Sequence, residues 1–293
     1  MFEGFTAERI ELAESSIFVR HGGTGPAVLL LHGHPRTSST WYLVAPRLIA
    51  AGFTVICPDL RGYGQSQGPQ PAADHSSHSK RASASDMAAV MSALGHDHFA
   101  VAGHDRGGPV AFRLTLDAPE RITHLAALDC IPISDHLRRC DARFAAAYWH
   151  WFFFARPRTP ERVINADPDR WYTGDPGEMG SENYDEFRQA TRNPDVVRGM
   201  LEDYRAGLTI DRAAEEADRA RGTRITCPVL VLWSLRDDLE ELHGDPRLIW
   251  REWAEQVDGH GIDSGHHMAE QAPGELASAL ASFLAAGSHP ASS

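Results

Sequence analysis

Short apolar runs alternate along the chain with segments in which apolar residues recur every three or four positions. Runs bounded by turn residues are typical of buried strands, and the wider spacing is typical of amphipathic helices. Their alternation predicts an α/β fold with a mainly parallel sheet and flanking helices. The clearest expected helix is Ser79–Leu94, and the expected strands are Ile10–Leu12 with Ser16–Arg20, Val28–His32, Val55–Pro58, Ala100–Gly103, Leu125–Leu128, Val229–Trp233 and Glu255–Val257.

The stretch from Ile131 to Gly222 breaks this alternation. It is rich in Trp, Tyr, Phe and Arg, and its apolar residues follow helical spacing, as in Tyr148–Phe154 and Glu202–Thr209. The strand pattern returns after Gly222. We therefore expect a core of residues 1–130 and 223–293 interrupted by a helical cap of residues 131–222, with a frayed tail from Ala285.

Composition narrows the class of protein. A chain of 293 residues with 42% hydrophobic content can bury a large core without disulfides or metal. The formal net charge of −12 argues against nucleic-acid binding through a basic face. A small-molecule substrate, even an anionic one, stays compatible with this charge, because a local arginine cluster can outweigh the global field.

Targeting and redox signals point to a cytoplasmic protein. The four cysteines are scattered and lack zinc-ligand spacing, which suits a reducing compartment and predicts no metal. The amino terminus lacks the apolar stretch of a signal peptide, and no window reaches the roughly 18 apolar residues that a membrane span needs. The oligomeric state stays open, with a homodimer as one option.

The strongest chemical motif is FAVAGHDRGG, residues 99–108. A strand followed by G-x-nucleophile-x-G and an apolar helix pattern is a nucleophile elbow, and here Asp105 occupies the nucleophile position. The alternative is that Asp105 only caps the following helix. The loop after the strand AVLLLHG would supply one oxyanion donor, the His34 amide, and Arg106 would supply the other.

A histidine and an acid complete the expected catalytic set. His266 lies in DSGHHMAE after the last strand, and its place directly after Gly265 favours it over His267. The acid would orient the imidazole and offset its charge. Asp129 after HLAAL and Asp237 or Asp238 after VLVLWSLR are both at strand ends, so the pattern leaves the choice open.

These motifs resemble the haloacetate (fluoroacetate) dehalogenases, a branch of the α/β-hydrolases with an aspartate nucleophile. The most specific stretches are GHDRGG, SKRASA, LDCIPI, YWHWFF and DYRAG. The resemblance implies that Asp105 is the nucleophile, His266 the base and Asp129 the acid. It also implies that Arg106 binds the substrate carboxylate and that three cap residues bind the halide: His150, Trp151 and Tyr204. Packing against the core is the expected role of Trp149, Phe152 and Phe153.

One position departs from the family pattern. A second arginine is expected four residues after the nucleophile, but Pro109 stands there, and Arg36 is a candidate to compensate. The expected activity is hydrolytic dehalogenation of a small 2-haloacid without a cofactor. An epoxide hydrolase that protonates its substrate with Tyr204, Tyr148 or Tyr172 is the main alternative, and a non-catalytic ligand receptor is another.

Overall fold

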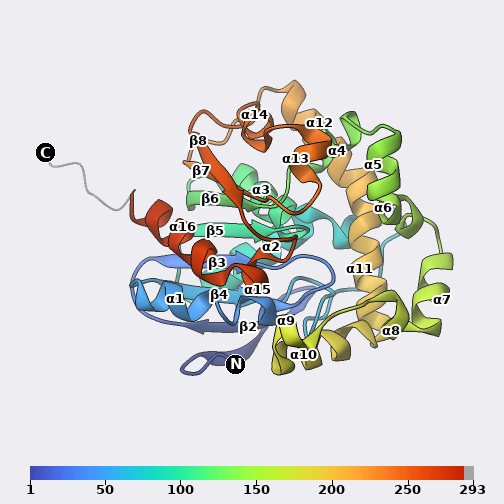
Figure 1. Ribbon diagram of the computed structural model, residues 1–293, viewed down its shortest axis with the longest axis horizontal. Helices are drawn as coiled ribbons and strands as arrows, with labels where there is room; N and C mark the ends of the chain where they lie inside the picture. Colours follow the sequence, from blue (N-terminus) through green and yellow to red (C-terminus); the bar gives the residue numbers. More distant parts are fainter. Residues whose placement is uncertain (287–293) are drawn as a thin grey trace, which may run out of the picture.

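Eight strands form a single mixed sheet in a computed structural model that describes residues 1–286 (Figure 1). The strand order is β1-β2-β4-β3-β5-β6-β7-β8. β2 pairs antiparallel with both β1 and β4, and the other neighbours are parallel. The strands are β1 (Thr6–Glu11), β2 (Ser16–Gly22), β3 (Ala27–Leu31), β4 (Thr54–Pro58), β5 (Phe99–His104), β6 (Ile122–Leu128), β7 (Val229–Ser234) and β8 (Val257–Ile262).

The buried strands follow the apolar runs of the sequence. In β3 the side chains alternate, with Leu29 and Leu31 in one core cluster and Val28 and Leu30 in the other. The last expected strand, Glu255–Val257, was wrong, because β8 runs over Val257–Ile262. β8 lies at the sheet edge, and its sequence VDGHGI carries two glycines and two polar residues, so it lacks the apolar run used for prediction.

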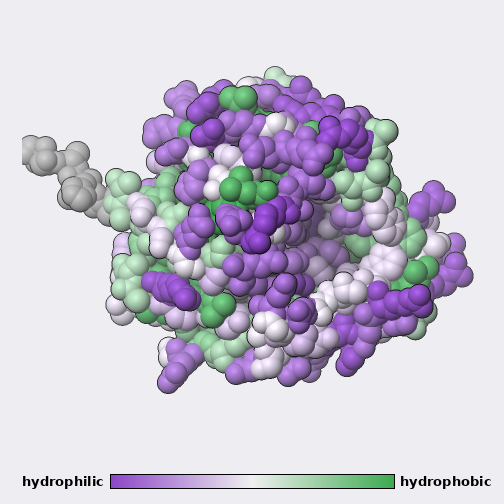
Figure 2. Space-filling view, viewed as in Figure 1, coloured by the Kyte–Doolittle hydropathy of each residue, from purple (hydrophilic) through white to green (hydrophobic). Residues whose placement is uncertain are grey.

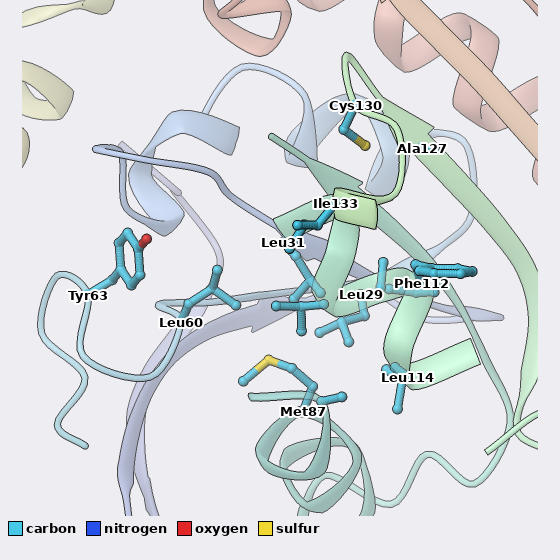
Figure 3. Packing of buried hydrophobic residues seen from close by; sticks show 14 of the residues in the cluster. Leu29, Leu31, Leu60, Tyr63, Met87, Phe112, Leu114, Ala127, Cys130 and Ile133 are labelled. Atoms are coloured by element: carbon cyan, nitrogen blue, oxygen red, sulfur yellow. The ribbon is translucent and has the colours of Figure 1, made fainter. Parts of the chain in front are cut away.

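Helices cover both faces of the sheet. The helices α2 (Lys80–Ala93) and α3 (Gly107–Asp117) pack on one face, where Met87 and Phe112 meet Leu29 and Leu31 (Figure 3). The helices α1 (Ala45–Ala50) and α16 (Pro273–Ala285) contribute to the cluster on the other face. This layering fixes the carboxyl ends of the parallel strands, where ligands of such sheets bind.

A run of helices joins β6 to β7 and gathers at one end of the molecule (Figure 1). It falls within the range expected for the cap, whose proposed boundaries at residues 131 and 222 stay a prediction. These helices are α4 (Ile133–Arg138), α5 (Ala142–Ala147), α6 (Trp149–Phe154), α7 (Thr159–Ala166), α8 (Pro168–Trp171), α9 (Pro176–Met179), α10 (Ser181–Thr191), α11 (Pro194–Ala206), the π-helical η3 (Gly207–Asp211) and α12 (Arg212–Ala220).

Short helices complete the core. They are η1 (Ser38–Trp41), η2 (Ser76–His78), α13 (Leu239–His243), α14 (Pro246–Trp250) and α15 (Met268–Gln271). The face in Figure 2 is mostly hydrophilic, with hydrophobic residues in small scattered groups. Within residues 1–286 no helix is both long and apolar enough to cross a membrane. The predicted frayed tail begins at Ala285, which is still the last residue of α16, and from residue 287 on it lies outside the described residues.

Candidate active site

Asp105 stands on the sharp turn between β5 and α3. Its φ of +48° lies in the left-handed region, which a non-glycine residue adopts only where the surroundings enforce it. The flanking glycines are sterically required. A Cβ on Gly103 would lie 2.3 Å from the Gly107 carbonyl oxygen, and a Cβ on Gly107 would lie 2.5 Å from those of Leu31 and His32. The motif thus forms the strand-turn-helix that the sequence indicated.

One carboxylate oxygen of Asp105 is bound by the loop after β3. The His34 N–H donates a hydrogen bond of 2.6 Å to Oδ1. Gly33 permits this approach, because a Cβ there would lie 2.4 Å from the same oxygen. The amide of Arg106, the second expected donor, directly follows Asp105 at the start of α3. Oδ1 therefore already has a donor suited to stabilising negative charge, and this hydrogen bond does not involve Oδ2.

His266, on the loop between β8 and α15, faces that other oxygen. Its Nε2 lies 3.6 Å from Oδ2 of Asp105, beyond ordinary hydrogen-bond distance. Burial disfavours the imidazolium, but the interactions with Asp105, Asp129 and Asp237 prevail and raise the pKa of His266 well above its ordinary value. Burial also opposes ionisation of Asp105, yet the interaction with His266 holds the pKa of Asp105 well below its usual range. The candidate nucleophile is therefore an anion paired with a cation.

Two carboxylates reach the second nitrogen of His266. Nδ1 lies 2.7 Å from Oδ2 of Asp129 and 3.0 Å from Oδ2 of Asp237. Only 1% of the Asp129 side chain is exposed, against 29% for Asp237. Oδ1 of Asp129 also accepts a hydrogen bond of 2.9 Å from the Ser234 amide. Asp129 is therefore the more rigidly positioned acid, although both strand-end candidates converge on the same histidine.

The two carboxylates differ in proton affinity. Burial raises the pKa of Asp129. Burial opposes ionisation of Asp237 as well, but the hydrogen bond from His266 prevails and lowers its pKa. The third candidate, Asp238, instead accepts a hydrogen bond of 3.0 Å from the Tyr148 hydroxyl. Asp238 therefore has a different partner, and Asp237 offers the more stable negative charge at Nδ1.

Arg106 is buried against α11. Its Nε donates to Oδ2 of Asp203 at 2.6 Å, and its Nη2 donates to the Asp203 carbonyl oxygen at 2.9 Å. The guanidinium also lies over the Tyr204 ring, 4.2 Å from the centroid. The planar group is thus fixed from three directions, as a binding residue needs to be.

Sequence reasoning missed two residues of this buried network. Lys80, at the first position of α2, is ion-paired with Asp203 and donates to the Arg106 carbonyl oxygen at 3.3 Å. Burial opposes ionisation of Asp203, but the charges of Arg106 and Lys80 prevail and lower its pKa. Two cations thus share one carboxylate. The stretches SKRASA and EDYRAGLT contain both residues, but neither pattern reveals that they meet.

The aromatic residues expected to bind halide come from α6 and α11, which pack together. Ring centroids of Trp151 and Tyr204 lie 6.0 Å apart, and those of His150 and Tyr204 lie 5.9 Å apart. The Tyr204 ring also lies 5.2 Å from that of His34. Among residues 1–286 the polar atoms of His150, Trp151 and Tyr204 side chains have no hydrogen-bond partner. Helices α6 and α11 thus bring three side chains without hydrogen-bond partners close to the loop after β3.

Other aromatic residues of α6 do not follow the expectation. Trp149 and Phe152 were expected to pack against the core, but 51% and 39% of these residues are exposed. They lie on the outer side of a short helix whose inner side carries Trp151 and Phe154. Phe153 is half-buried and packs on Trp171, with ring centroids 5.4 Å apart.

A small cavity opens beside Asp105. It has room of about 20 Å³ for the centres of water molecules, close to the minimum for one ordered water. Its walls include the catalytic candidates and residues of the segment between β6 and β7: Asp105, Arg106, Pro109, Asp129, Cys130, Ile131, His136, Tyr148, Trp151 and His266. His150 and Tyr204 are not part of this wall. The candidate nucleophile, base and acid therefore share the wall of one small cavity.

Arg36 does not compensate for Pro109. It forms a two-pronged ion pair with Glu270, with distances of 2.9 and 3.1 Å, and it lies over the Phe187 ring. Pro109 lines the cavity, but Arg36 does not. The earlier expectation fails because Arg36, unlike Arg106, lies outside the cavity wall and is held there by a buried carboxylate far away in the sequence.

A cluster of metal-ligand types lies next to Asp105. Among the described residues, His104, Asp129 and His266 could bring three ligand atoms together. His104 Nε2 is already 2.7 Å from the His266 carbonyl oxygen, and Asp129 contacts Nδ1 of His266, so hydrogen bonds within the candidate catalytic set account for this cluster.

A larger cavity of about 550 Å³ lies between the loop at residues 62–71 and helices α10 and α11. None of the catalytic candidates lines it.

Residues 26–270 match the alpha/beta hydrolase fold family, and the chain belongs to it. It is 39% identical to a fluoroacetate dehalogenase from Burkholderia sp, over 97% of this chain and 95% of that protein. A soluble epoxide hydrolase from Corynebacterium sp. (strain C12) is 33% identical over 86% of this chain and 87% of that protein. The structure of ALR0039 from Nostoc sp PCC 7120 superposes with a TM-score of 0.93 at 39% identity, covering 97% and 99% of the two chains. The predicted fold class and the resemblance to haloacetate dehalogenases are thereby confirmed.

Proposed function

We propose that this protein hydrolyses the carbon–halogen bond of a small 2-haloacid through an ester formed on Asp105. The observation that carries the proposal is the unequal environment of the two Asp105 oxygens. Oδ1 accepts a hydrogen bond from the His34 amide, whereas Oδ2 lies 3.6 Å from Nε2 of His266. Asp105 and His266 both line the cavity. The similarity to a fluoroacetate dehalogenase supports this reaction over other hydrolyses.

The first step is a displacement by Asp105. Oδ2 attacks the carbon that carries the halogen, the new C–O bond forms, and the halide leaves with the bonding electron pair. The step needs an ionised carboxylate, which the lowered pKa of Asp105 provides beside His266. Arg106, on the cavity wall, would bind the substrate carboxylate and align the carbon with Oδ2.

The departing halide needs hydrogen-bond donors while its charge develops. The side chains of His150, Trp151 and Tyr204 offer an imidazole, an indole N–H and a phenol that no residue within 1–286 engages. We assign these three residues to halide binding. Fluoride, the strongest acceptor among the halides, would benefit most from them.

Hydrolysis of the ester is the second step. His266 takes a proton from water, and the hydroxide attacks Cγ of Asp105. The resulting negative charge forms on Oδ1, where the amides of His34 and Arg106 would stabilise it. The Cγ–Oδ2 bond then breaks, and the hydroxy acid leaves with Oδ2 and a proton. Once Asp105 is esterified its charge is gone, so His266 loses one of the partners that favour its protonated form.

The test is halide release from fluoroacetate, chloroacetate and bromoacetate in water enriched in ¹⁸O. In a single turnover we expect the label on Asp105 and ordinary oxygen in the hydroxy acid, because the product carries away Oδ2. Label in the first-turnover product would show direct attack by water and overturn the ester mechanism. Absence of halide release from all three acids would overturn the substrate class.

Epoxide hydrolysis is a second candidate. The Tyr172 hydroxyl is buried without a hydrogen-bond partner in the described chain, and its ring lies 5.4 Å from that of His34. A buried unpaired phenol could protonate an epoxide oxygen, as the similarity to an epoxide hydrolase also suggests. Diol formation from small epoxides, without halide release from the haloacids, would favour this reaction. Tyr172→Phe should then abolish diol formation.

A further inference from the structure

The cavity beside Asp105 offers little polar surface for the far end of a substrate. Pro109, Cys130 and Ile131 provide an apolar part of its wall, and the cation Arg106 is already paired with Asp203. A substrate carboxylate has two oxygens with several acceptor positions, so one arginine that shares its charge leaves acceptors unsatisfied. A further donor is therefore needed at this end of the cavity.

Of the polar side chains on this wall, His136 and Tyr148 have no role in the proposed dehalogenation, and the Tyr148 hydroxyl already donates to Asp238. His136 belongs to α4, is 4% exposed, and its ring lies 5.2 Å from that of Trp151. Its Nδ1 lies 2.9 Å from Nε2 of His243. Its Nε2 has no hydrogen-bond partner among residues 1–286, so Nε2 is the polar atom that His136 offers to the cavity.

The pairing with His243 determines where the His136 proton lies. Burial lowers the pKa of His136 well below its ordinary value and that of His243 to about 4, so both rings are neutral near pH 7. Nδ1 of His243 is buried without a partner in the described structure. An unsatisfied buried N–H is less favourable than an unsatisfied acceptor, so the His243 proton is on Nε2, where it is donated to His136. His136 then carries its own proton on Nε2, toward the cavity.

We infer that His136 is a second substrate-binding residue, whose Nε2–H donates a hydrogen bond to the substrate carboxylate beside Arg106 while His243 fixes its tautomer. This inference rests on the proposed function and names the residue that recognises the acid group. A neutral imidazole supplies direction without a second positive charge. It therefore binds a small carboxylate without adding a third cation beside Arg106 and Lys80, which already share Asp203.

The experiment compares the wild type with His136→Phe, which removes the donor but keeps a ring of similar size. His136→Gln retains an amide N–H near the position of Nε2. We expect His136→Phe to raise KM for chloroacetate about ten- to hundredfold with kcat changed much less, and His136→Gln to restore most of the loss. The matched control is His124→Phe, a buried histidine of β6 that packs on Phe283 in the other core cluster.

Binding of acetate, followed by NMR at the Trp151 indole, separates this inference from the proposed function because it needs no turnover. His136→Phe should weaken acetate binding by the same factor as KM. Unchanged acetate binding and KM would overturn the inference and leave the dehalogenase proposal intact. A loss of stability and kcat that His136→Gln does not rescue would show a packing role and overturn it as well. If no haloacid is turned over but acetate binding still depends on His136, only the reaction is refuted.

Discussion

Nε2 of His266 and Oδ2 of Asp105 face each other across 3.6 Å, too far for an ordinary hydrogen bond between them. This geometry suits a base that activates water against an ester better than one that deprotonates the nucleophile itself. The carboxylate needs no such activation, because its pKa is already low.

Asp105→Asn should reduce kcat by on the order of 10⁴-fold or more, because an amide is a poor nucleophile of nearly the same shape. His266→Asn should instead permit ester formation and block its hydrolysis. Intact-protein mass spectrometry should show an adduct on Asp105 in the His266 variant. The control is His267→Asn, which changes the neighbouring histidine and should accumulate no adduct. Full turnover in His266→Asn without any adduct would refute the assigned base.

Asp129→Asn should cost far more activity than Asp237→Asn, because Asp129 is the more buried and the better-positioned partner of Nδ1 of His266. We expect a loss in kcat on the order of a thousandfold for the first variant and within about tenfold for the second. Steady-state kinetics with chloroacetate provides the measurement. The reverse ranking would place the catalytic acid after β7.

Asp237→Asn should also move the rise of kcat with pH to lower pH. Water activation needs a neutral imidazole, so kcat rises as His266 loses its proton, and interaction with Asp237 raises the pKa of that group. Asp238→Asn is the control, since Asp238 bonds to Tyr148 instead. A midpoint that stays put or moves upward in Asp237→Asn would contradict the prediction.

Asp203→Asn should lower the free energy of unfolding by about 3–5 kcal/mol, because it leaves the buried cations Arg106 and Lys80 without their shared carboxylate. Urea denaturation measures the change. Glu216→Gln, which breaks the exposed pair with Arg212, should cost less than about 1 kcal/mol. Equal losses in the two variants would mean that the buried network does not stabilise the fold.

Local sequence patterns were sufficient to predict the buried strands and the turn that carries Asp105. The apolar runs marked the five strands β3 to β7, because a buried parallel strand must be apolar on both faces. The glycines beside Asp105 marked the nucleophile turn, because only glycine fits where the backbone approaches within about 2.5 Å of a would-be Cβ. The edge strand β8 escaped detection, since Asp258 and His260 lie on an exposed face and interrupt the apolar run.

What the sequence by itself determined is therefore the fold class, the turn at Asp105 and the short set of candidates for base and acid. The tertiary structure alone decided that Asp129 and Asp237 reach the same nitrogen of His266 and that Arg36 is paired with Glu270. It alone brought His136 to His243, 107 positions away. Hydrogen bonds and ion pairs of this kind join side chains from distant elements, and their strength depends on burial that no local pattern records. The sequence identifies the residues, but which of them contact one another is decided only by tertiary packing.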